Sequence, residues 1–202
     1  NTVVNIGKQG LTTPYTVATD INGNEQTGTG ILALSNVGPV TFGAGYFNNT
    51  NLDQSTELNH QHGLGYLAAS KAYVTGPLTT DTQSVLDGAA DMYVATVQGD
   101  LDFVKLEAWY AGLQETFNTY TLAATSNLDL AENAKLGLEA RYVYLKLDSD
   151  LVGNFVERDN SMMRFAVDGK FSIVNARLAY TKTDKDGGLT ALDQDAKNTS
   201  LG

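Results

Sequence analysis

The chain has 202 residues, an apolar content of 42%, 20 glycines, 10 tyrosines and no cysteine. This composition favours an ordered, strand-rich protein over a disordered one, and the absence of cysteine excludes disulfides, cysteine nucleophiles and thiolate metal sites. The net charge of -10 argues against nucleic acid and anionic membrane surfaces as partners, because no basic stripe exists that would displace counterions from phosphates.

Alternation of apolar and polar residues predicts nine strands, which in chain order cover residues 2–9, 28–35, 40–47, 91–98, 101–111, 115–125, 135–146, 162–168 and 171–182. Tight turns are predicted at 98–100 and 168–170, each around a glycine. Longer polar stretches predict loops over 12–27, which Pro14 interrupts, and over 48–89. Short turns that alternate with long polar loops are typical of an up-and-down barrel.

The strand predicted at 101–111 has two clearly different faces. Leu106 and Tyr110 fall on one side of an extended strand, whereas Lys105 and Glu107 fall on the other. No run of about 18 apolar residues exists, which excludes a helical membrane span, but barrel strands need only about 9 to 11 residues of alternating pattern. We therefore predict an all-β protein, an antiparallel up-and-down transmembrane β-barrel of the porin type whose charged side chains face a water-filled lumen.

The same alternation assigns two sets of side chains to the two faces of the barrel. Charges of both signs would face the lumen and tune its ion preference, and tyrosines that recur about 8 to 11 residues past the turns would form an aromatic girdle. The lumenal set is Lys105, Glu107, Glu139, Arg141, Arg164, Asp168 and Arg177, and the girdle set is Tyr46, Tyr110, Tyr142 and Tyr180. For both sets the alternative is a soluble sandwich with a solvated polar face and ordinary strand tyrosines.

The 12–27 loop contains oxygen-bearing side chains at alternate positions. Asp20, Asn22 and Asn24 have this spacing, and Glu25 follows them. Calcium loops use such a spacing, but an EF-hand would have glycine in place of Glu25 and would have flanking helices. Two interpretations stay open, a calcium ion held by these four residues and a loop without a metal.

Catalytic motifs are missing from the sequence. Ser35, Ser70 and Ser161 do not lie in G-x-S-x-G, and no glycine-rich phosphate loop with a following lysine exists. The two histidines lie in the single loop 48–89, which leaves little material for general-base chemistry near neutral pH. We predict that the protein is not an enzyme.

Several stretches resemble a known family of porins. Gly7-Lys8-Gln9 followed by Leu11-Thr12-Thr13-Pro14 is similar to the strand end and constriction-loop entry of porins. The run 90–150, which includes AWYAGLQETFNTYTLAATSNLDL, resembles the major outer membrane porin family of epsilonproteobacteria, and the order of segments is similar over 5–186.

This resemblance implies a homotrimeric barrel of about 18 strands in the bacterial outer membrane. The chain would supply an internal segment of about half of that barrel. The loop 12–27 would fold into the pore, with Tyr15, Asp20, Asn22, Asn24 and Glu25 lining the constriction.

The predicted function is passive diffusion of ions and small hydrophilic solutes through a water-filled barrel with a charged constriction, with outer membrane lipid around it and no cofactor required. One alternative is a soluble all-β binding module that recognises glycans or proteins through Trp109 and surface tyrosines, in which Leu106 would belong to the core. The other is a barrel that acts mainly as a surface adhesin through its long outer loops, such as 48–89.

Overall fold

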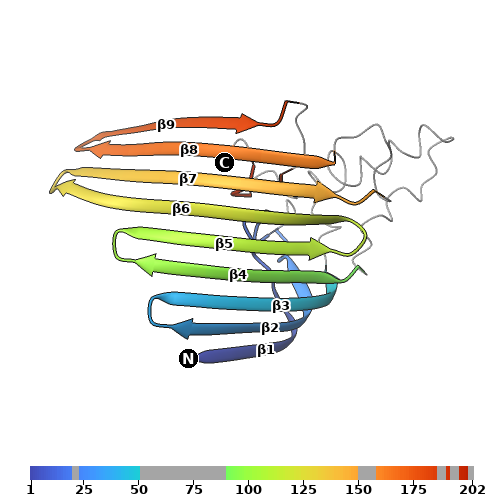
Figure 1. Ribbon diagram of the computed structural model, residues 1–202. Coiled ribbons are helices and arrows are strands. Elements are labelled where there is room, and N and C mark those ends of the chain that lie inside the picture. The colour runs from blue at the N-terminus through green and yellow to red at the C-terminus, as the bar shows by residue number, and fades with distance from the viewer. Residues whose placement is uncertain (20–22, 51–89, 150–157, 186–189, 192–195, 200–202) are drawn as a thin grey trace.

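A single antiparallel sheet contains all the strands of the described residues, which are 1–19, 23–50, 90–149, 158–185, 190–191 and 196–199 of the computed structural model. The nine strands in those ranges are β1 (Thr2–Gly10), β2 (Thr27–Val37), β3 (Val40–Thr50), β4 (Met92–Leu101), β5 (Val104–Leu113), β6 (Phe117–Ala131), β7 (Ala134–Leu147), β8 (Asp159–Phe171) and β9 (Val174–Thr183). Each strand pairs with the next one in the sequence (Figure 1), which confirms the up-and-down arrangement for this part of the chain. Among the same residues, no helix is long and apolar enough to cross a membrane.

The two ends of the sheet differ in the length of their connections. Tight turns join β2 to β3, β4 to β5, β6 to β7 and β8 to β9 at one end, which we call the turn end (Figure 1). The other connections gather at the opposite end, the loop end, and the first of them covers residues 11–26. Most of the long loop predicted at 48–89 lies outside the described residues, because β3 ends at Thr50 and the description resumes at Ala90.

Two turns lie further along the chain than the glycine positions predict. The predicted turns 98–100 and 168–170 lie inside β4 and β8, and the chain reverses at 102–103 and 172–173. Gly99 is paired on both sides, so the two ladders hold it in the extended strand. The first residue of each observed turn has a positive φ, 48° and 54°, which lets these turns form without glycine.

The outer face of the sheet is apolar and exposed. Leu106, Leu138 and Leu178 lie on it with 45%, 38% and 77% of their surfaces exposed. Soluble proteins rarely expose an apolar patch that extends over a whole sheet, whereas barrel strands turn this face to lipid. The arrangement contradicts the soluble binding module, whose core these leucines would have formed.

The inner face changes character between the two ends of the sheet. On β7, Glu139 and Arg141 occupy the middle of this face, and Val143, Leu145 and Leu147 continue it toward the loop end with at most 1% exposure. These apolar side chains are buried because segments outside the sheet cover them. The resulting core cluster consists of Leu11, Tyr15, Phe47, Met92, Val94, Ala111, Leu113, Phe117, Leu145, Leu147, Ala191 and Ala196.

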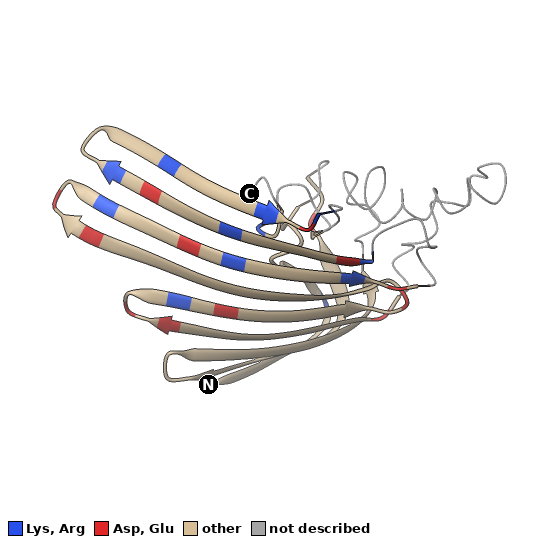
Figure 2. Cartoon of the chain, turned by 45° about the horizontal axis from the view of Figure 1, so that its top comes forward, with Lys and Arg blue, Asp and Glu red and all other residues tan. Residues whose placement is uncertain are grey.

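Charged side chains are distributed unevenly around the curved sheet. Figure 2 shows that most of them lie along β4 to β9, whereas β1 contributes Lys8 alone and the sequences of β2 and β3 contain none. The ion pairs that Glu107, Glu139 and Asp168 form with lysine and arginine lie on the inner face, whereas the pair of Lys146 with Asp159 lies on the outer face near the loop end. The sheet therefore has one charged region on its inner face, and that region adjoins the covered apolar cluster.

Candidate functional site

A carboxylate between arginines forms the centre of the charged region. Arg141 and Arg164 are paired directly across β7 and β8, an arrangement in which two like charges repel. Glu139 relieves this repulsion, because its Oε1 accepts from Arg141 Nε at 3.0 Å and from Arg164 Nη2 at 2.8 Å. Both arginine side chains are only 3% exposed, so this group is a buried part of the wall.

Other charges nearby are accessible to water. Arg177 Nη1 lies 3.4 Å from both carboxylate oxygens of Asp168, and each of these side chains is about half exposed. Lys105 Nζ lies 3.4 Å from Glu107 Oε1. A cavity of about 550 Å³ adjoins these groups, lined among others by Asp100, Lys105, Glu107, Glu139, Arg177 and Lys197. The predicted lumenal charges thus lie together on one face, with both signs present.

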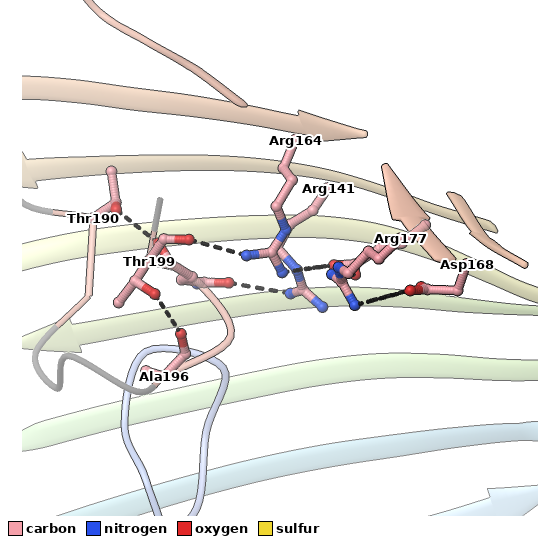
Figure 3. Close-up of polar contacts among 9 residues, drawn as sticks. Arg141, Arg164, Asp168, Arg177, Thr190, Ala196 and Thr199 are labelled. Atoms are coloured by element: carbon pink, nitrogen blue, oxygen red, sulfur yellow. Dashed lines mark hydrogen bonds and ion pairs between the residues drawn. The ribbon is translucent and has the colours of Figure 1, made fainter. Parts of the chain in front are cut away.

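A short stretch beyond β9 crosses the buried arginines. We call residues 190–191 and 196–199 the inner strap. Arg141 Nη1 donates to Asn198 Oδ1 at 3.1 Å, and Arg164 Nη1 donates to the backbone oxygen of Thr199 at 3.0 Å (Figure 3). The two arginines therefore connect Glu139 on the wall to the strap on its inner side.

Asn198 is the most highly connected residue of the strap and is fully buried, with 0% exposure. Its Nδ2 donates to Thr121 Oγ1 on β6 at 2.7 Å, and its backbone oxygen accepts from Thr190 Oγ1 at 2.6 Å. Its backbone nitrogen donates to the backbone oxygen of Pro14 at 2.8 Å. Asn198 thus links the wall, the strap and the connection between β1 and β2.

That connection, residues 11–19 and 23–26, is called the entry loop here. Leu11 donates its backbone N–H to the Gln26 carbonyl at 2.9 Å, which closes the base of the loop. Tyr15 is 1% exposed, and its ring meets the Phe117 ring edge-on at 6.1 Å. Burial raises the pKa of Tyr15, so the phenol stays neutral. The ring therefore faces the sheet and fastens the loop, whereas the sequence predicts that it lines a channel.

The remaining residues predicted for this loop are divided between described and undescribed parts. Asn24 and Glu25 are exposed, whereas Asp20 and Asn22 lie outside the described residues. Within the described part, no group of three or more histidine, cysteine, aspartate or glutamate side chains is arranged to hold a metal. The calcium site therefore stays a prediction.

The four predicted girdle tyrosines lie on the outer face. Two tyrosines on descending strands, Tyr93 on β4 and Tyr120 on β6, lie beside two of them, a feature that the sequence analysis missed because it followed only the ascending strands. Ring centroids are 5.4 Å apart for Tyr46 and Tyr93, and 5.1 Å apart for Tyr110 and Tyr120. Tyr144 lies 6.4 Å from Tyr120. Tyr142 and Tyr180 are 45% and 62% exposed on the same face.

Solved structures with the same fold are outer membrane proteins of Pseudomonas aeruginosa. The chain superposes on OccD3 (OpdP) with a TM-score of 0.64 and 16% identity, covering 91% of this chain and 41% of that one. For OpdL the values are 0.69 and 14%, with 100% and 51% coverage, and for OprD they are 0.62 and 18%, with 90% and 40%. The chain thus spans about half or less of the length of each, and its open sheet corresponds to part of a transmembrane barrel.

Comparison at the level of sequence families is more specific. No curated protein matches the chain. The sequence model of one family, the Campylobacter major outer membrane protein, matches residues 1–200. Because this match extends over almost all 202 residues, the chain belongs to the Campylobacter major outer membrane protein family and is located in the bacterial outer membrane.

Proposed function

We propose that the full-length protein containing this chain is a porin, through which ions and small hydrophilic solutes diffuse passively. The observation that carries this proposal is the sidedness of the sheet. Leu106 and Leu178 are exposed on one face, whereas Glu139, Arg141 and Arg164 form a bonded cluster on the other. In an outer membrane barrel the first face contacts lipid and the second faces water.

The entry loop and the inner strap narrow the water path in this proposal. Both lie against the inner face near the loop end, and the cluster that includes Leu11, Tyr15 and Ala196 holds them there. The accessible charges next to them, Lys105 and Arg177 with their carboxylate partners, would set up a field across the path. Fixed charges of both signs bias the passage of ions without a tight binding site.

Two further points belong to the same proposal. The full-length protein is a homotrimer, as the family resemblance implies, and its solutes include small carboxylates. Structures of neighbouring proteins have been solved as OpdK with vanillate and as OccK2 with glucuronate. Both ligands carry a carboxylate, and the half-exposed guanidinium of Arg177 is suited to such a group.

Conductance of the full-length protein in planar lipid bilayers tests the proposal. Purified protein is expected to produce discrete current steps, and a heat-denatured sample is the control. A protein that acted only as an adhesin would bind its surface partner without such steps. Light scattering in detergent measures the oligomeric state independently, and a monomer would contradict the trimer alone.

A further inference from the structure

We propose that Asn198 is a positioning residue that fastens the inner strap and the entry loop into one unit, and that Arg141 and Arg164 hold this unit on the wall. The inference rests on the proposed porin function and adds the part of the wall that fixes the width of the path. In this view the two buried arginines do not contact permeating ions. Arg177, which is half exposed, does.

Asn198 forms hydrogen bonds with four residues. Its side chain accepts from Arg141 and donates to Thr121, and its backbone bonds to Pro14 and Thr190. An amide supplies both an acceptor and a donor, so it can satisfy a guanidinium and a hydroxyl at once. At 0% exposure water cannot replace these partners, and the loss of Asn198 leaves several buried polar groups unsatisfied.

The entry loop and the inner strap depend on the same residue, Asn198, for their attachment. The Asn198 backbone N–H donates to the Pro14 carbonyl oxygen at 2.8 Å, which joins the strap to the entry loop. Leu11 and Tyr15 of the loop share one apolar cluster with Ala191 and Ala196 of the strap. A strap that leaves the wall therefore removes support from the loop as well.

The two buried arginines and Arg177 differ in their contacts. Arg141 and Arg164 are 3% exposed and each bonds to the strap, whereas Arg177 forms ion pairs with Asp168 and Glu139 on the wall. Substitution at Arg177 should therefore change the field in the water path and leave its width unchanged. Loss of a contact between the strap and the wall should change the width of the water path and leave the field in it unchanged.

Single-channel recording of the full-length protein in planar bilayers tests this. Asn198→Leu keeps the branched heavy-atom skeleton of the side chain and removes its hydrogen bonds. We expect a higher open conductance and added current noise, because the strap and the loop move away from the wall. Asn198→Asp should keep the wild-type conductance, because its carboxylate accepts from Arg141 and from the Thr121 hydroxyl. Arg177→Gln should shift the reversal potential and alter the conductance through the lost charge, without added current noise.

Folding is checked on every variant by heat-modifiable migration on gels. Wild-type conductance and noise in a folded Asn198→Leu protein would overturn the inference, and so would the same noise in Arg177→Gln. If Asn198→Leu does not fold, Thr190→Val tests the inference in its place, since it removes one hydrogen bond to Asn198. We expect a smaller rise in conductance and noise from it, and no rise would overturn the inference. An absence of current steps in the wild type would instead refute the proposed porin function.

Discussion

Two arginines that face each other across neighbouring strands repel, so other groups must stabilise them. Three groups stabilise Arg141 and Arg164. Glu139 neutralises part of their charge, and the Asn198 side chain and the Thr199 carbonyl each accept a hydrogen bond from one of their Nη1 atoms. A buried charge is tolerated when it is paired and hydrogen-bonded, and both guanidinium groups are, although Arg164 Nε has no hydrogen-bond partner among the described residues. The cluster is thus a structural joint built from residues that look like channel charges in the sequence.

Arg141→Ala should therefore destabilise the folded protein. The substitution removes one partner of Glu139 and the partner of Asn198 Oδ1, both in a poorly hydrated place. We expect the free energy of unfolding to fall by about 3 kcal/mol, as for other broken buried ion pairs. Urea titration of the full-length protein in detergent measures it. Arg177→Ala is the matched control, with an expected loss below about 1 kcal/mol because its ion pair is half exposed. Equal losses in the two variants would contradict the joint.

Tyr15 makes stability depend on alkaline pH. Burial raises its pKa above the unfolded value of about 10, so above that pH the unfolded state loses a proton that the folded state keeps. Its contribution to the free energy of unfolding is therefore constant below about pH 10 and declines as the pH rises further. Other tyrosines titrate too, so the informative quantity is the difference between the wild type and Tyr15→Phe. A difference that stays constant up to pH 11 would contradict this prediction.

At the scale of the strand, alternation was sufficient to predict the faces. On β7 it assigns Leu138 and Glu139 to opposite faces, and in the structure Leu138 is exposed on one face while Glu139 forms ion pairs on the other. The turn positions were less predictable. Pairing on both sides of Gly99 outweighs the local turn preference of glycine, and that pairing is a property of three strands together.

The inner strap could not be predicted, because residues 183–202 carry no period that distinguishes a surface loop from one folded inward. One indirect signal was present. Val143, Leu145 and Leu147 have the same parity as Glu139 and Arg141, so alternation assigns them to the inner face as well. Apolar residues on a face that meets water require a cover. The sequence thus indicated that something covers this end of β7, although it could not indicate which segment.

A pair of arginine substitutions tests the assignment of faces. Leu138 lies on the outer face of β7, and Asn127 lies on the inner face of β6 next to the residue that pairs with Leu138. Leu138→Arg should lower the free energy of unfolding in lipid by about 2 to 4 kcal/mol, because it places a charge among acyl chains. Asn127→Arg at a similar depth should change it little. Denaturant titration in bilayers gives both values, and a reversed order would contradict the assignment.

For the molecule as a whole, the uneven distribution of charge is the main electrical feature. Most ionised groups lie along β4 to β9, and β2 and β3 contain no charged residue (Figure 2). A field between a charged and an uncharged wall acts on ions over roughly a Debye length. Selectivity that arises in this way depends on the salt concentration of the surrounding solution.

The reversal potential should therefore shrink as salt increases at a fixed concentration ratio across the bilayer. The Debye length falls from about 30 Å at 0.01 M to about 3 Å at 1 M, so the accessible charges of Lys105 and Arg177 are screened at high salt. Measurements at several total concentrations check this. A reversal potential that does not depend on salt would indicate a binding site in place of a diffuse field.

The bond between the Asn198 backbone and the Pro14 carbonyl has a consequence for the order of assembly. Every strand pairing in the sheet joins sequence neighbours, and only β3 and β4 are separated by a long connection. The contact between the entry loop and the strap, by contrast, joins segments from opposite ends of the described chain, and it needs Thr121 and Arg141 already in position. The hairpins of this chain can thus pair one after another, and the contact between the entry loop and the strap forms after the strands that carry Thr121 and Arg141 are in place.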